Sequence, residues 1–276
     1  MRGLGGPALV FLWGVNSGSL GALNYVEPDS LQITERDREL LGFVAAHRFV
    51  RADHVQIFLA VSAPVAHARL RALRRAGLVR RDVVFHRTPA THQITRDGLA
   101  AIGSSLPVPK RDLRTYAHDV GAAWLWLAAR DGAFGELREV IGKRELRSRD
   151  GPGRRSEPQL AVRLGGFGPG GQERLHYPDL LLVTPQGHRI AVELELTGKG
   201  KARRERILEG YACDPNLDVV LYLVRDGRVG AQIEASARRL GITPMVQVQR
   251  VAMADPTRQA ASPRAPARRR TRQIAR

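Results

Sequence analysis

Apolar and polar residues follow a helical period in the first part of this chain. Between Thr34 and Gly77, aliphatic side chains recur every three or four residues in three short segments, which predicts three helices. Thr34 suits the N-cap of the first helix, with Asp37 in the position of a capping box, and Gly77 suits the end of the third. Segments 78–85 and 91–95 then have the character of two short strands, and a further helix is expected from Arg96.

The second half combines helical segments with strands. A long apolar helix is expected from Tyr116, with His118 near its start as a capping or core histidine, and a second helix is expected over 135–149. Strands are predicted at 159–164, from Asp179 to Val183, at 191–197, at 219–224 and at 244–251, with helices over 201–211 and 229–240. The glycine-rich stretch 165–171 is expected to be a flexible connection. This order, α-β-β-β-α-β followed by α-β, predicts an α/β domain built on a mixed sheet.

The hairpin 179–197 carries paired acids. Val192, Leu194 and Leu196 alternate with Glu193 and Glu195, so the two carboxylates lie side by side on the face opposite the aliphatic residues. Asp179 begins the preceding strand. A two-residue loop would direct Asp179 to the apolar face, whereas a three-residue loop at 185–187 or 186–188 would direct it to the acidic face. We expect the loop 185–187, because Pro185 suits a type I turn and Gly187 suits a left-handed position.

The chain is strongly basic. It has 44 Lys and Arg residues against 27 Asp and Glu, a formal net charge of +17, and a sequence pI near 11.3. Such a balance favours a polyanionic partner, and double-stranded DNA is the partner we expect. Three helices followed by two strands are typical of a winged helix-turn-helix, whose third helix enters the major groove. The expected DNA-binding residues are Arg69, Arg71, Arg74, Arg75, Arg80, Arg81, Lys201, Arg203 and Arg204.

Several of these residues match a known motif. Pro178-Asp179, the pair Glu193-x-Glu195 and Lys199 resemble the PD-(D/E)xK nuclease motif, with glutamate at the position of the motif lysine. Together with the upstream winged helix, residues 34–251 resemble the replication-relaxation family of actinobacterial plasmids and integrative elements. The resemblance implies a restriction-endonuclease-like domain that acts in replication or transfer of the element, alongside element-encoded proteins.

The same resemblance implies a candidate catalytic site. Asp179 and Glu193 would bind Mg²⁺, Glu145 would add a ligand from the first helix of the nuclease domain, and Lys199 would take the place of the lysine that Glu195 replaces. Only four lysines occur in the chain, and two of them, Lys199 and Lys201, follow these acids. Lysine can shift its pKa and move a proton, whereas arginine effectively cannot.

The expected organisation has five segments: a disordered extension (1–30), a winged helix-turn-helix (31–105), a linker and connecting helix (106–134), the nuclease-like domain (135–253) and a disordered basic tail (254–276). Two alternatives remain open: a non-catalytic DNA-binding replication factor on a degenerate nuclease fold, and a winged-helix transcriptional regulator that forms a homodimer. The lone Cys213 fits a reducing cytoplasm, and no apolar run reaches the length of a membrane span.

Overall fold

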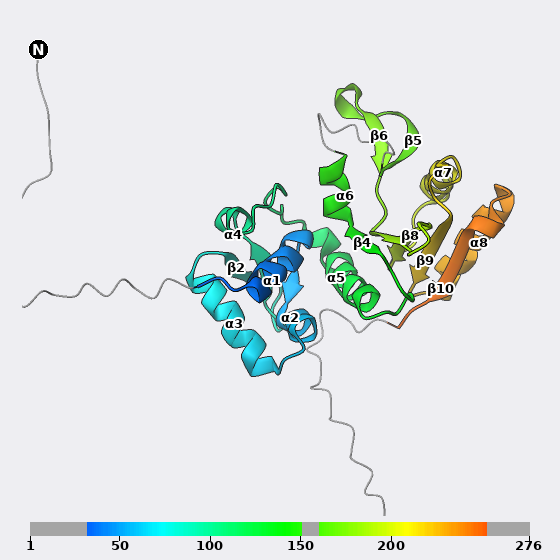
Figure 1. Cartoon of the computed structure of the whole chain (residues 1–276). Coiled ribbons are helices and arrows are strands. Elements are labelled where there is room, and N and C mark those ends of the chain that lie inside the picture. The colour runs from blue at the N-terminus through cyan, green and yellow to red at the C-terminus, as the bar shows by residue number, and fades with distance from the viewer. Residues whose placement is uncertain (1–31, 151–159, 253–276) are drawn as a thin grey trace, which may run out of the picture. The chain divides into compact units, whose positions relative to one another are not determined.

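The computed structural model describes residues 32–150 and 160–252, which form a mixed α/β structure (Figure 1). The segments predicted as a disordered extension (1–30) and a disordered basic tail (254–276) lie outside the described residues. Among the residues described, no helix is both long enough and apolar enough to cross a membrane.

The N-terminal part contains four helices and a small antiparallel sheet within the described residues. Its elements are α1 (Glu35–Ala46), β1 (Val50–Arg51), α2 (Ala52–Leu59), α3 (Ala63–Arg75), β2 (Val79–Asp82), β3 (Thr91–Ile94) and α4 (Arg96–Ala101), with the strands in the order β1-β3-β2. The predicted capping box is confirmed, because the side chains of Thr34 and Asp37 each bond the backbone N–H of the other residue. The sequence did not predict β1, which pairs with β3.

Helix α5 (Tyr116–Arg130) packs on both parts of the described chain. Tyr116 and Val120, near its start, lie against Phe49 of the N-terminal part. Leu125 and Ala129, near its end, lie against aliphatic side chains of the large sheet. The connecting helix predicted from Tyr116 therefore packs against two hydrophobic clusters, one in each part.

The large sheet has five strands in the part of the chain that is described, in the order β10-β9-β8-β7-β4. Helices α7 and α8 cover one face and α5 covers the other, as Figure 1 shows. Strand β8 is antiparallel to β7 and parallel to β9, and β9 is parallel to β10. The bounds are β4 (Glu139–Gly142), β7 (Leu180–Val183), β8 (Arg189–Glu195), α7 (Lys201–Ala212), β9 (Val219–Val224), α8 (Gly227–Arg239) and β10 (Val246–Arg250).

The helix predicted over 135–149 is wrong. Residues Glu139–Gly142 form β4, which pairs antiparallel with β7, and only Lys143–Arg149 form a helix, α6. The spacing of Leu137, Val140 and Ile141 fits a helix turn. Val140 and Ile141 are β-branched, however, and such residues favour a strand when they can pair with a buried neighbour such as β7. The first helix of the sheet domain is therefore α5, and its first strand is β4.

Two further strands form a separate hairpin between α6 and β7. Strand β5 (Val162–Phe167) pairs antiparallel with β6 (Glu173–His176), outside the five-stranded sheet. The strand predicted at 159–164 was expected to belong to the main sheet, and β6 was not predicted. Short 3₁₀ helices complete the described chain, at Leu113–Thr115, Pro169–Gly171 and Thr243–Met245.

The predicted loop of the β7–β8 hairpin is confirmed. The pairs run from Leu180 with Val192 to Val183 with Arg189, and the N–H of Thr184 bonds the carbonyl of His188. Residues 185–187 are thus the three-residue loop, and Gly187 has a φ of 92°, a left-handed conformation that glycine adopts without strain. At the other end of β7, the N–H of Asp179 bonds the carbonyl of Val192. Asp179 therefore lies beside the end of β8 that carries both glutamates.

Candidate functional site

Three buried acids lie at one end of the large sheet. Asp179 comes immediately before β7, and Glu193 and Glu195 are the last residues of β8 on their face. The carboxyl ends of the parallel strands β8, β9 and β10 meet at this end of the sheet. In open α/β sheets this is the end at which ligands usually bind, so these acids form the candidate site.

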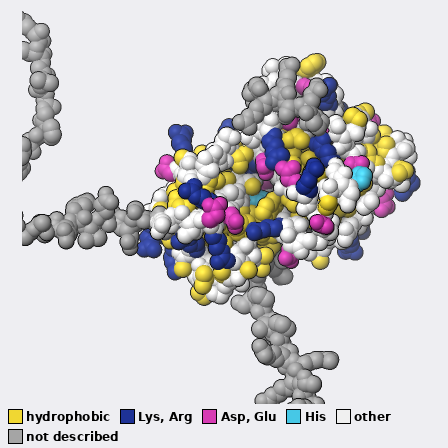
Figure 2. Space-filling view, in the orientation of Figure 1, with side chains coloured by type: hydrophobic (Ala, Val, Ile, Leu, Met, Phe, Trp, Pro, Cys, Tyr) yellow, Lys and Arg dark blue, Asp and Glu magenta, His cyan; other side chains and the backbone are white. Residues whose placement is uncertain are grey.

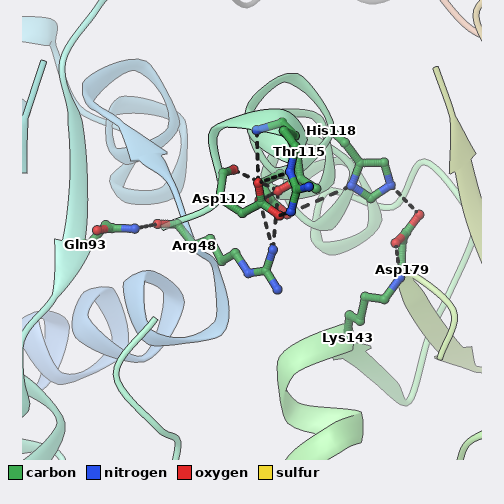
Figure 3. A network of polar contacts seen from close by, with 9 residues as sticks. Arg48, Gln93, Asp112, Thr115, His118, Lys143 and Asp179 are labelled. Carbon is green, nitrogen blue, oxygen red and sulfur yellow. Dashed lines mark hydrogen bonds and ion pairs between the residues drawn. The ribbon is translucent and has the colours of Figure 1, made fainter. Parts of the chain in front are cut away.

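Asp179 lies between two cationic side chains (Figure 3). Its Oδ1 accepts a hydrogen bond from Nζ of Lys143 at 2.9 Å. Its Oδ2 lies 2.9 Å from Nε2 of His118 and accepts the N–H of Leu194 at 3.0 Å. Two strands and two helices, with their adjoining residues, therefore converge on a single carboxylate.

Charge controls protonation around Asp179. Burial alone would raise the pKa of Asp179, but the charges of Lys143 and His118 outweigh it and hold that pKa below its ordinary value. Burial likewise opposes the charged form of His118, yet the neighbouring carboxylates raise the pKa of His118 to about 10. Asp179 also raises the pKa of Lys143, against the effect of burial. At neutral pH, a carboxylate is thus held between an imidazolium and an ammonium.

Glu193 has a different set of partners. Its Oε1 lies 2.5 Å from Nε2 of His176 and accepts a hydrogen bond from the hydroxyl of Tyr211, which comes from α7. Although burial would raise the pKa of Glu193, His176 lowers it. Burial and the nearby Glu193 charge raise the pKa of Tyr211 well above its ordinary value, so the phenol keeps its proton. Glu193 is therefore an ionised carboxylate with a neutral donor beside it.

Glu195 pairs with Lys199, four residues along the chain. Burial is the largest influence on Glu195 and raises its pKa despite the opposing charge of Lys199. The lysine that the sequence placed at the centre of the chemistry therefore contacts Glu195, while a different lysine, Lys143, contacts Asp179.

A chain of polar contacts runs from Asp179 to the N-terminal part (Figure 3). His118 Nδ1 lies 4.0 Å from Asp119 Oδ1, and Asp119 accepts a hydrogen bond of 2.7 Å from the hydroxyl of Thr115. Arg48 donates to Thr115 at 3.3 Å and lies 3.5 Å from Asp119. The carbonyl of Arg48 accepts from the Gln93 amide of β3 at 2.5 Å. Helix α5 thus links the small sheet to the acid site.

In this arrangement other groups engage Asp179, which is a predicted Mg²⁺ ligand. A metal at Asp179 needs one of its carboxylate oxygens, and both already accept hydrogen bonds, including those from cations that would repel a further positive charge. Among the residues described, no group of three or more His, Cys, Asp or Glu side chains is placed to hold a metal ion.

Several other predicted residues make structural contacts elsewhere. Glu145 forms an ion pair with Arg149 at 2.7 Å within α6, so it is not part of the acid cluster. Arg69 bonds Asp37 and thereby supports the start of α1, and Arg80 bonds the Gln93 amide. Arg204 bonds Ser236 and Gln232, which ties α7 to α8. The remaining predicted DNA-binding residues are exposed: Arg71, Arg74, Arg75, Arg81, Lys201 and Arg203.

Four residues of the site were not predicted from the sequence: His118, Lys143, His176 and Tyr211. Each contacts its acid across 17 or more residues of chain. One signal was present for Lys143, since lysine is rare in this chain and Lys143 is one of the four.

Comparison of this chain with known proteins found no similar protein. No protein-family model matches the chain. No curated protein and no solved structure matches it either.

Proposed function

We propose that this protein binds double-stranded DNA through helix α3, with α1–α3 and β1–β3 acting as a winged helix-turn-helix. The observation that carries the proposal is the outer side of α3. Arg71, Arg74 and Arg75 are exposed there, while Leu70 and Leu73 are buried on the opposite side. An α-helix fits the major groove, and arginine binds both phosphate oxygens and guanine edges.

The charges around α3 support DNA binding by the outer side of this helix. In the described residues, none of the three arginines forms an ion pair with an acid, so their charges are available to a polyanion. Arg81 of β2 is also exposed and adds positive charge on the strand that follows α3. By contrast, Arg69 bonds Asp37 and Arg80 bonds Gln93, and we assign them supporting roles in this surface.

We assign the second half a nuclease-like fold on its element order. With α6 and the β5–β6 hairpin inserted between β4 and β7, the elements α5, β4, β7, β8, α7 and β9 follow the order αβββαβ. Asp179 comes immediately before the second of these strands, and Glu193 and Glu195 lie on the third, as in the PD-(D/E)xK motif. Together with the N-terminal part, this order supports a role in the replication or transfer of a mobile element, as the replication-relaxation resemblance implies.

Of the two roles open to such a domain, we propose the non-catalytic one. Asp179 is neutralised by Lys143 and His118, and Glu193 is engaged by His176 and Tyr211. In a hydrolytic site those carboxylates would have to be free to bind a metal. The acid cluster instead holds α5, α6 and the sheet together.

The DNA-binding proposal predicts a change in salt dependence. Replacing Arg71, Arg74 and Arg75 together by glutamine should weaken duplex binding and reduce the slope of log K against log salt by roughly two to three units. Fluorescence anisotropy with a labelled duplex over a range of salt concentrations measures the slope. The matched control replaces Arg225, Arg228 and Arg238, three exposed arginines of the C-terminal half, and should leave the slope nearly unchanged. Equal slopes in both triple variants would show that the DNA-binding surface does not lie on α3.

The non-catalytic role predicts the result of a cleavage assay. Purified protein incubated with supercoiled plasmid and Mg²⁺ or Mn²⁺ should bind the plasmid without nicking it, and gel electrophoresis measures the product. The matched protein for comparison is Glu193→Gln, which removes one negative charge from the acid cluster. Metal-dependent nicking by the wild type that disappears in Glu193→Gln would refute the non-catalytic role.

A further inference from the structure

A cavity of about 300 Å³ opens beside Asp179. It is lined by the end of α1 and the residues after it, by the first turns of α5, and by α6. Five of its lining side chains are cationic when His118 is protonated, namely Arg48, His118, Lys143, Arg144 and Arg147, and three are acidic, namely Asp112, Asp119 and Asp179. A sixth basic residue of the lining, His47, is neutral, because burial lowers its pKa to about 3. The charged side chains of this lining therefore have an excess of positive charge when His118 is protonated.

The acids of the cavity are already engaged. Asp112 pairs with Arg114, which lies outside the lining, and Asp119 contacts Arg48 and His118. Asp179 is held by His118 and Lys143. The positive charge of the cavity is therefore only partly neutralised by its own carboxylates.

Arg144 and Arg147 carry the uncompensated charge. Arg144 donates to the backbone carbonyls of Ala45 at 3.0 Å and of Pro107 at 2.5 Å, which are neutral groups. Arg147 lies over the ring of Tyr177, with its guanidinium carbon 5.5 Å from the ring centre. In the described parts of the chain, neither arginine forms an ion pair with a carboxylate.

The pKa of Arg144 reflects the same excess of positive charge in the cavity. Burial and the nearby charge of Arg48 lower the pKa of Arg144 to about 10. An anion in the cavity would relieve that repulsion. Lys and Arg side chains also gather around α6 on the face of the molecule seen in Figure 2.

We propose that this cavity binds a phosphate monoester, the group at the end of a nucleic acid strand or on a free nucleotide. Guanidinium and ammonium donors on several sides suit phosphate, because each of its oxygens accepts charge-assisted hydrogen bonds. A volume of about 300 Å³ is at the small end of ligand sites and suits a single nucleotide, not a duplex. The choice of a nucleic acid phosphate rests on the DNA-binding function proposed above.

The cavity shares residues with the polar contacts that connect the acid site to the N-terminal part. Arg48 and His118 both line the cavity and both belong to the polar chain of Figure 3. A bound phosphate would thus contact residues from α5, from α6 and from the segment after α1. The nuclease-like half would then bind its ligand next to the acid cluster, through basic side chains and without a metal ion.

Calorimetric titration of the full chain tests the site with four probes: inorganic phosphate, a deoxynucleoside 5′-monophosphate, and a short single-stranded oligonucleotide with either a 5′-phosphate or a 5′-hydroxyl. Monoester binding should weaken roughly tenfold in Arg147→Gln, the low end of what one charge-assisted hydrogen bond contributes. Arg147→Lys should retain most of the affinity. Arg147 is exposed, so neither variant should alter the melting temperature.

The matched control is Arg138→Gln, which removes the same charge from an exposed residue outside the cavity. It should bind the monoesters as the wild type does. The tightest probe identifies the source of the phosphate: a preference of the 5′-phosphorylated over the 5′-hydroxyl oligonucleotide indicates a strand end. The proposal is overturned if no monoester binds, or if Arg147→Gln and Arg138→Gln bind them equally. Because no duplex is used, these outcomes are independent of DNA binding by α3.

Discussion

Replacing Asp179 by asparagine is expected to lower the free energy of unfolding by about 3 kcal/mol, near the low end of the cost of removing one partner from a buried ion pair. The carboxylate is 3% exposed and holds Lys143 and His118 through separate oxygens. An asparagine side chain offers one acceptor oxygen and directs an N–H₂ group at a cation. Urea denaturation at pH 7 measures the change.

The matched control for Asp179→Asn is Asp218→Asn. Asp218 is an exposed acid that contacts His188 and the N–H of Arg189. Because contacts of this exposed kind contribute little, its replacement should cost about 1 kcal/mol or less. Similar losses in the two variants would mean that Asp179 does not connect the elements around it.

Stability is expected to fall as pH rises from about 6.5 to about 10. The pKa of His118 is about 10 in the folded protein against an ordinary value of 6.5. Within this window the folded protein holds a proton on His118 that the unfolded chain has lost. The stabilisation is complete below the lower value and disappears as pH passes the upper one. The slope contributed by one proton is up to about 1.4 kcal/mol per pH unit.

Denaturation curves at several pH values between 6 and 10 measure this slope, and His118→Gln is the comparison. The variant has no imidazole to titrate, so its stability should vary less with pH in this window. Asp179 does not contribute to the same slope, because its pKa is lowered and its proton binds only in acid. If His118→Gln had the wild-type slope, a different group would be responsible.

The acids and their relative placement could be predicted because the signals are local. Alternation over β8 fixes which residues share a face, and the residues Pro185 and Gly187 favour one loop length. The N-terminal helices could be predicted for a similar reason. The capping residue Thr34 and the terminating residue Gly77 lie next to the periodic apolar segments whose ends they mark.

The partners of the acids could not be predicted, because tertiary packing selects them. Lys143 and His118 lie 36 and 61 residues from Asp179 in sequence. Helix α6 was predicted in part, but the strand before it was not, so the position of Lys143 at the end of β4 was missed. His118 and Tyr211 have the sequence context of ordinary helical residues, and only the approach of α5 and α7 to the sheet brings them to the acids.

Between Lys143 and His176, the described elements are α6 and the β5–β6 hairpin, and neither belongs to the large sheet. Lys143 pairs with Asp179 and His176 pairs with Glu193, so both ends of this segment are attached to the same acid cluster. Keeping those ends together has an entropic cost that the two ion pairs help to offset. Local unfolding of α6 and the β5–β6 hairpin should therefore be coupled to protonation of the acid cluster. Acid that protonates Asp179 and Glu193 would break both ion pairs and let these elements unfold together while the strands of the large sheet remain paired.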